Sequence, residues 1–525
     1  MNNLRNCLRN LLFTNHTTKL LGGNGGSSNR IETVVIDYSS PNIAKPFHLG
    51  HFRAAVTGNF VKNINEAFGH KVIGINYIGD WGTQFDILAS GFSKYGDEDE
   101  LQRNPIEHLY KIYVQANRDI QLLNDRKPLD RIGNENEPVS SAESIVNHIT
   151  EIQSRDTEFW RRVRQITCEQ LTSNYKRMNI QFTTFEYESD YVEKAYSIAS
   201  KLLANGLAYK SSDGLICIST ENTSDINFSK QDIVILKSDK STLYLTRSMI
   251  GANDDKSDND QSNKCARNLL HVPFGRVIGV STRKGEGLFL RNILDNAQQF
   301  MLNRMKSSQN TRITQNESTN ASLSRGEIAD HLGVTCLVTT MFTNPRQKPI
   351  NLQTFLGLPV MPPSNSQLLK SSPNGSELNG LSLQYCHARL CSLESRSIST
   401  GLFEFNVCSD GTSKMYDVNH LIHEYDQFIE WPSTTINEKC FMKLADQLYR
   451  FSTVLHIAYS KYEPYYILQY ALQLTSAVNS AWKHLPILTC PNREDQLLRL
   501  YIFIASRNVL ASCLRLMGIK PLKAM

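Results

Sequence analysis

Two histidines stand three residues apart in the segment NIAKPFHLGHFR, residues 42–53. His48 and His51 flank Gly50, and Lys45 lies three residues before His48. Histidines in such a setting bind a metal, act as a base with a partner, donate hydrogen bonds to a phosphate, or pack in a core. The choice among these roles depends on the elements that position the pair.

The flanking sequence predicts an α/β unit. TVVIDY (33–38) is a β-branched run typical of a buried strand, and it ends near Pro41. HFRAAVTGNFVKNINEAFG (51–69) has apolar residues at helical spacing and a glycine stop. KVIGINYIGD (71–80) predicts a second buried strand, and WGTQFDILASGF (81–92) opens another helix. This alternation indicates a parallel sheet whose crossover brings both strand ends to one edge.

The predicted position of the histidines favours a phosphate. Ligands of such sheets bind outside the carboxyl ends of the strands, where helix N-termini attract anions. We expect His48 and His51 to donate to nucleotide phosphates, Gly50 to let a flat base approach, and Lys45 to add charge. A metal site would need a third ligand, and the nearby sequence offers none with suitable spacing. Packing histidines are the other alternative.

A second basic segment supports a nucleotide. VIGVSTRKGEG (277–287) is a loop bounded by glycines that carries Ser281, Thr282, Arg283 and Lys284 in succession. Hydroxyls, a guanidinium and an ammonium on one loop suit a triphosphate. Taken by itself, this pattern is also typical of a solvated turn.

Length and composition predict several domains. The chain of 525 residues exceeds one ordinary core, and its 40% hydrophobic and 20% charged residues are typical of a soluble protein without a membrane span. The net charge of +5 is compatible with nucleic acid without arguing for it. Eleven scattered cysteines without a C-x-x-C pair fit a reducing compartment. Residues 1–31 lack Asp and Glu, which favours a mitochondrial targeting leader over an ordinary disordered terminus.

The predicted domains follow from these patterns. We expect a catalytic domain over residues 32–350, with a helical and β insertion at about 100–240 and a degraded stretch at 248–270. A linker is expected over 351–380, because MPPSNSQLLKSSPNGSELNG (361–380) has a linker composition. Residues 381–525 contain amphipathic helical runs and predict a helical domain.

Several segments resemble one family when taken together. SSPNIAKPFHLGHFR, INYIGDWGTQFD, LYLTR, HVPFGRVIGVSTRKG and LQYCHARL follow one another in the order found in class I arginyl-tRNA synthetases of the mitochondrial and fungal type. The resemblance implies a Rossmann-like catalytic domain with insertions, followed by an all-α anticodon-binding domain. It implies attachment of arginine to tRNA(Arg) through arginyl-adenylate, with ATP and its Mg²⁺ counter-ion and no protein-bound metal. We expect a monomer in the mitochondrial matrix, with the cytoplasm as the alternative.

The resemblance also assigns residues. His48 to His51 correspond to the HIGH element and Val280 to Lys284 to the KMSKS loop. The implied catalytic residues are His48, His51, Lys45, Arg283 and Lys284, and the implied ATP-binding residues are His48, Gly50, His51, Ser281, Thr282 and Lys284. The implied arginine-binding residues are Asp37, Ser39, Asn42, Tyr244, Asp80 and Gln84, while a helix-start cap with packing is the alternative for Asp80 and Gln84. Arg389 is a weaker candidate for tRNA, with a core helix as its alternative.

One departure from the family bears on activity. The family continues LYxTR with an aspartate that binds the guanidinium of the substrate, whereas this chain has Ser248. The polar stretch 251–268 stands where the family has a further strand and a substrate-binding glutamine. We therefore hypothesise as an alternative that this chain is a catalytically impaired tRNA-binding isoform or the product of a mis-spliced gene.

Overall fold

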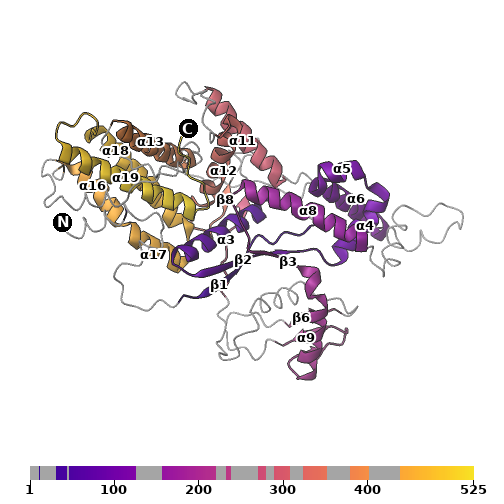
Figure 1. The fold of residues 1–525 in the computed structure, drawn as a ribbon. Coiled ribbons are helices and arrows are strands. Elements are labelled where there is room, and N and C mark those ends of the chain that lie inside the picture. Colours follow the sequence, from indigo (N-terminus) through magenta and orange to yellow (C-terminus); the bar gives the residue numbers. More distant parts are fainter. Residues whose placement is uncertain are drawn as a thin grey trace, which may run out of the picture.

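The structure is a computed structural model of the 525-residue chain. Figure 1 shows its arrangement. It describes residues 11, 31–43, 47–125, 157–219, 232–237, 270–278, 289–307, 323–351, 379–400, 435 and 438–525.

A parallel three-stranded sheet forms the centre of the catalytic part. Its strands are β1 (Thr33–Asp37), β2 (Lys71–Ile78) and β3 (Thr184–Tyr187), in the order β1-β2-β3. Both pairs of strands are parallel, with Thr33 opposite Lys71 and Ile75 opposite Thr184. The α/β prediction is therefore confirmed. The expectation that β1 is buried is wrong, because its residues alternate between exposed and half-buried. The reason is that β1 lies at the edge of the described strands.

The helix α3 (Leu49–Ala67) packs on this sheet and is deeply buried. It is followed by Gly69, whose φ of 89° suits the predicted glycine stop. Gly58 lies where α3 crosses the end of β1, and a Cβ placed there would be 2.2 Å from the Cβ of Tyr38. The close approach of helix and strand therefore requires glycine at this position.

A long helical crossover joins β2 to β3. Its helices are α4 (Thr83–Tyr95), α5 (Glu98–Arg103), α6 (Pro105–Asp125) and α8 (Thr157–Arg177). The sequence places an insertion at about 100–240, but β3 lies within that range and pairs with β2 in the central sheet. Its four residues, TFEY, are too short a run for local periodicity to distinguish from their surroundings.

Smaller elements follow β3. The 3₁₀ helix η2 (Glu188–Tyr191) and α9 (Val192–Ala204) precede an antiparallel sheet of β4 (Tyr209–Lys210), β5 (Ile216–Ile218) and β6 (Ile233–Leu236). This small unit lies below the central sheet in Figure 1. The chain then forms β7 (Val277–Ile278), α11 (Leu290–Ser307), α12 (Arg325–Met341) and β8 (Ile350–Asn351), and β7 pairs in parallel with β8.

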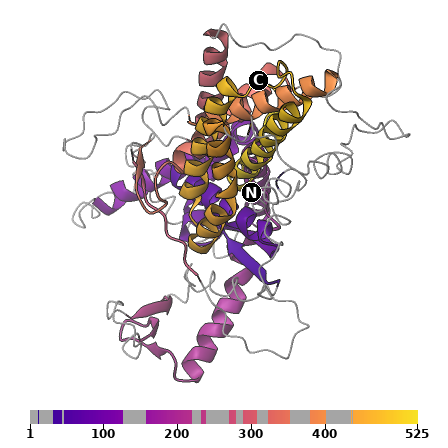
Figure 2. The same ribbon diagram turned by 90° about the vertical axis from the view of Figure 1, so that its left-hand side faces the viewer.

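The C-terminal part is a layer of helices that lie side by side in both views (Figures 1 and 2). They are α13 (Asn379–Ser399), α16 (Lys439–Tyr449), α17 (Phe451–Lys461), α18 (Pro464–His484) and α19 (Arg493–Leu516). By length and composition α19 could cross a membrane, but 83% of its most apolar stretch of 18 residues is buried inside the protein. Packing within this helical layer therefore accounts for its apolar sequence.

The helical layer contacts α3 directly. Asn63 Nδ2 donates to the carbonyls of Arg515 and Leu516 at the end of α19, at 3.1 and 3.3 Å. Phe68 stacks on Tyr459 of α17 with ring centroids 3.9 Å apart. These contacts hold the helical layer against the helix that begins at the histidine pair.

Candidate active site

The carboxyl edge of the sheet collects the predicted arginine-binding residues that the structure describes. Asp37 ends β1, and Asn42 forms a parallel bridge with Gly79 just after β2. Asp80 follows that bridge, and Gln84 lies in the first turn of α4. Because β1 and β2 are parallel, their ends meet at one edge, as the sequence predicts.

The turn after β1 has an unusual backbone. Ser39 and Ser40 have φ angles of 72° and 44°, in a region that residues other than glycine seldom adopt. The hydroxyl of Ser39 is hydrogen-bonded to that of Tyr175 at 2.7 Å, and Ser40 N donates to Asn76 Oδ1 at 3.1 Å. Ser40 Oγ donates to Asp37 Oδ1 at 2.5 Å. This network holds the turn in its strained conformation and orients the Asp37 carboxylate.

The histidine pair forms the N-terminal cap of α3. His48 is the N-cap residue, and its Nδ1 accepts from Gly50 N at 3.0 Å. His51 Nδ1 accepts from His48 N at 3.3 Å, and the two rings stack with centroids 4.0 Å apart. A neutral imidazole that accepts at Nδ1 carries its proton on Nε2. The backbone thus sets the tautomer in which both Nε2–H groups are donors.

Gly50 has a role that its sequence pattern does not reveal. A Cβ at this position would lie 2.7 Å from Cε1 and 2.9 Å from Nδ1 of His48. Because His48 folds back over the first turn, any side chain at residue 50 would displace its ring. Its predicted role of admitting a flat base stays a prediction.

A cluster of aromatic side chains packs against the histidine pair. Phe47 is buried and contacts the rings of His51 and Tyr175, with centroids 5.3 and 5.8 Å apart. Tyr175 packs edge-on against Phe182. Tyr175 joins this cluster to Ser39, so α8 links the turn after β1 with the histidines. Nothing in the local sequence of α8 marks Tyr175 for this position.

Asp80 is enclosed by protein groups. It is 1% exposed, and its carboxylate accepts from Ser189 N at 2.9 Å and from Ser189 Oγ at 2.8 Å. Arg164 lies 3.5 Å from the carboxylate and stacks between the rings of Trp160 and Tyr187. Burial raises the pKa of Asp80, while Ser189 and Arg164 oppose the rise.

The helix-cap alternative for Asp80 and Gln84 is wrong in one respect, because the N-cap of α4 is Gly82. Gly82 has a φ of 110° and caps the helix without a side chain. Gln84 Oε1 is buried and has no hydrogen-bond partner among the described residues. A buried acceptor of this kind suits a polar ligand.

Some predicted residues cannot be placed. Those that lie outside the described residues are Lys45, Tyr244, Ser281, Thr282, Arg283 and Lys284. Ser248 and the polar stretch 251–268 also lie outside them. Their predicted roles therefore stay predictions.

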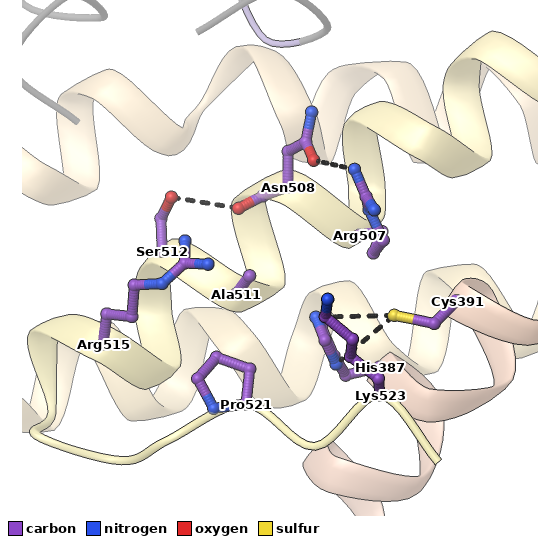
Figure 3. A pocket seen from close by; sticks show the side chains of 9 residues that line it. All are labelled: His387, Cys391, Arg507, Asn508, Ala511, Ser512, Arg515, Pro521 and Lys523. Atoms are coloured by element: carbon purple, nitrogen blue, oxygen red, sulfur yellow. Dashed lines mark hydrogen bonds between the residues drawn. The ribbon is translucent and has the colours of Figure 1, made fainter. Parts of the chain in front are cut away.

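The C-terminal part of the chain brings several cationic side chains together around one cavity. Arg507, Arg515 and Lys523 line a cavity of about 130 Å³ together with His387 (Figure 3). Arg507 is paired with Glu394 at 2.5 Å, whereas Arg515 and Lys523 form no ion pair within the described part of the chain. Arg389, the weaker candidate for tRNA, places its guanidinium 3.9 Å above the ring of Trp482, and its role toward tRNA stays a prediction.

The free energy of unfolding is expected to fall on acidification because of His387. Burial lowers the pKa of its imidazole to about 4, and Arg507, Arg515 and Lys523 add repulsion, although hydrogen bonding to the Leu522 carbonyl at 2.8 Å opposes both. The unfolded chain therefore binds a proton first, at its ordinary pKa of about 6.5. The stabilisation is complete above that value and is lost as the pH falls toward 4.

This loss is expected to be about 2 kcal/mol between pH 7 and pH 5. Urea unfolding at both pH values measures it, with His387→Gln as the control because glutamine keeps a donor without titrating. Equal pH dependence in the two proteins would contradict the assignment to His387.

Comparison with known proteins follows the same division of the chain. The family of class I (R) tRNA synthetase catalytic domains matches residues 17–266, and the DALR anticodon binding domain family matches residues 383–525. A solved arginyl-tRNA synthetase from Thermus thermophilus has the same fold, with a TM-score of 0.63 at 16% identity, covering 99% of this chain and 86% of that one.

Two relatives establish the family. The probable mitochondrial arginine–tRNA ligase of Mus musculus is 30% identical over 513 residues, which cover 93% of this chain and 78% of that protein. The mitochondrial arginine–tRNA ligase of Saccharomyces cerevisiae is 31% identical over 521 residues, which cover 94% of this chain and 72% of that protein. Similarity of this extent, through both domains, shows that the chain belongs to the arginine–tRNA ligase family.

Proposed function

We propose that the protein attaches arginine to tRNA(Arg) in two steps. A carboxylate oxygen of arginine attacks the α-phosphorus of ATP, and pyrophosphate leaves with the electrons of the broken P–O bond. A hydroxyl of the terminal tRNA ribose then attacks the arginyl carbonyl, and AMP leaves. Relatives named as arginine–tRNA ligases support this assignment. Neither step requires a nucleophile from the protein, so catalysis rests on positioning and charge stabilisation.

The stacked histidine pair is the observation that carries the proposal. His48 and His51 hold their Nε2–H donors at the N-terminus of α3, where developing negative charge is also favoured by the helix dipole. In this proposal both donate to phosphoryl oxygens. Lys45 and the pair Arg283 and Lys284 neutralise the remaining phosphate charge, as the family resemblance implies.

The carboxyl edge of the sheet is proposed to bind arginine. Asp37 and Asn42 contact its α-amino end, Tyr244 contacts its guanidinium, and Ser39 and Gln84 line the pocket. Asp80, whose carboxylate is engaged by Ser189 and Arg164, supports this edge from within the protein. Gln84 Oε1, which is buried and has no hydrogen-bond partner in the described part of the chain, supports a polar ligand there. A carboxylate and amide oxygens suit an ammonium group because they supply acceptors and negative charge.

ATP use follows from the class I catalytic domain. We infer that Mg²⁺ enters as the counter-ion of ATP, because phosphate oxygens and water are the ligands it prefers. Within the described ranges, no group of three histidine, cysteine or acidic side chains is placed to hold a metal. In this proposal the phosphates of ATP supply the metal ligands.

Pyrophosphate exchange tests the assignment. Purified protein with arginine, tRNA and MgATP is expected to incorporate labelled pyrophosphate into ATP, and a panel of amino acids is expected to show charging with arginine alone. A protein that binds tRNA(Arg) without exchanging pyrophosphate would support the impaired isoform. Nothing in the described residues or the relatives favours that alternative.

The helical layer is proposed to bind the tRNA anticodon arm. Its match to the DALR anticodon binding domain family supports this role. Arg515 and Lys523 offer charge for phosphates beside the cavity in Figure 3. The protein is also proposed to act as a monomer.

Replacing Arg515 and Lys523 together by glutamine is expected to raise the KM for tRNA about 3- to 10-fold, since each phosphate contact contributes electrostatic affinity. The KM for ATP is expected to stay unchanged, because Arg515 lies near the end of α19 and Lys523 lines the same cavity, which the histidine pair does not line. Aminoacylation over a range of salt concentrations measures both constants. A tRNA KM with the salt dependence of the wild type would contradict these contacts.

We propose the mitochondrial matrix as the location. The basic N-terminal composition and the mitochondrial relatives support it, although cytoplasmic ligases match to a similar extent. Import of the full chain into isolated mitochondria tests the proposal, and retention outside the organelle would favour the cytoplasm.

A further inference from the structure

Arg53 is a buried cation whose hydrogen bonds to the described residues go to main-chain carbonyls. It lies two residues after His51 on α3 and is 1% exposed. Its Nη1 donates to the carbonyls of Gly275 and Arg276 at 2.6 and 3.2 Å. Its Nη2 donates to those of Arg346 and Lys348 at 2.7 and 2.8 Å. Within the described residues, no acidic side chain forms an ion pair with it.

These four carbonyls belong to two adjacent segments that Arg53 holds together. Gly275 N donates to the Arg346 carbonyl at 2.8 Å, and Ile350 N donates to the Arg276 carbonyl at 3.0 Å. A Cβ on Gly275 would lie 2.4 Å from the carbonyl oxygen of Gln347, so the two segments approach closely only with glycine there. The same two segments continue into the parallel pair of β7 and β8.

The first segment leads toward the predicted KMSKS loop. β7 ends at Ile278, two residues before Val280 in the sequence. On the other side of the loop, Leu290 N donates to the carbonyl of Phe47 at 3.0 Å, and Phe47 directly precedes His48. The described chain on both sides of the loop is therefore bonded to the beginning of the helix that carries the histidine pair.

We propose that Arg53 is a positioning residue that sets the placement of β7, and thereby of the chain entering residues 280–284, relative to His48 and His51. This inference rests on the proposed function, in which both groups contact one triphosphate. A displacement of about 1 Å between such groups can reduce the rate about 10²-fold.

The chemistry of the side chain explains why arginine occupies this position. A guanidinium presents several N–H donors in one rigid plane, and here two of its nitrogens reach four carbonyls on two segments. A lysine ammonium has three donors on a flexible stem and binds as a point charge. Burial lowers the pKa of Arg53 to about 10, which still leaves it charged at neutral pH.

The test compares Arg53→Lys with Arg177→Met. Arg177 also joins separate elements, because it binds Asp295 and Asp330 of α11 and α12. Its hydrogen bonds within the described residues go to α11 and α12 and do not reach β7 or β8. Arg53→Lys is expected to lower kcat for pyrophosphate exchange about 10- to 100-fold, with the KM for arginine changed less than twofold. Arg177→Met is expected to lose stability without this loss of kcat at a temperature where both proteins are folded.

A second variant and a measurement of hydrogen exchange test the same role of Arg53. Gly275→Ala separates the same two segments without changing Arg53 and is expected to give the same loss of kcat. Amide hydrogen exchange, which does not depend on activity, is expected to show faster exchange of residues 275–278 in Arg53→Lys but not in Arg177→Met.

The outcomes separate the two proposals. A wild-type protein without pyrophosphate exchange would refute the proposed function, and the hydrogen-exchange comparison would then decide the role of Arg53. An active wild type with equal kcat and equal hydrogen exchange in Arg53→Lys and Arg177→Met would overturn the positioning role alone.

Discussion

Replacement of His48 by asparagine is expected to lower kcat for pyrophosphate exchange about 10²- to 10³-fold, the usual effect of removing one donor to a developing oxyanion. The Nδ1 atom of His48 is used by the backbone of α3, so the lost donor is Nε2–H. Asparagine is among the best N-cap residues and can accept from the first turn as His48 does. The change therefore separates catalysis from helix capping.

The control is His48→Ala, which removes both the donor and the cap. It is expected to show the same loss of kcat and in addition to be about 1 kcal/mol less stable, the usual cost of an N-cap. Steady-state exchange and urea unfolding of both variants measure the two effects. Exchange by His48→Asn within threefold of the wild-type rate would contradict the phosphate-donor role.

The sequence predicts elements well where the local pattern is strong. The predicted helix at 51–69 and strand at 71–80 correspond to α3 and β2 within two residues at each boundary. β3 is different, because its four residues become a strand through parallel pairing with β2. Pairing between residues about a hundred positions apart is a tertiary effect that local propensity does not contain.

The candidate site, like the fold, is predictable from the sequence only in part. The position of His48 and His51 at the start of a helix that follows a strand is predictable, since it follows from the strand–helix alternation. The acceptor role of both Nδ1 atoms depends on ring orientation, which the sequence does not specify. Arg53 was missed because its partners lie 222 to 295 residues away. The one available signal was a charged residue on the apolar face of a predicted helix.

Replacing Asp80 by alanine is expected to lower the free energy of unfolding by about 3–5 kcal/mol. The family resemblance assigns Asp80 to arginine, but in the structure its carboxylate accepts two hydrogen bonds from Ser189 and lies beside Arg164. Alanine leaves these donors without an acceptor in a buried site. Trp160 Nε1 donates to the main-chain carbonyl of Asp80 at 2.9 Å, a hydrogen bond that the alanine variant keeps.

Asp80→Asn distinguishes support of the fold from contact with arginine. Asparagine keeps an acceptor for Ser189 and loses only the negative charge, so it is expected to be less destabilising than alanine. Urea unfolding measures the stability of both variants, and exchange kinetics below their unfolding midpoints measure the KM for arginine. If Asp80 serves Ser189 and Arg164 alone, this KM stays within twofold of the wild-type value in Asp80→Asn. A tenfold rise in that KM, with stability preserved, would place the carboxylate in contact with the substrate and contradict the purely structural role.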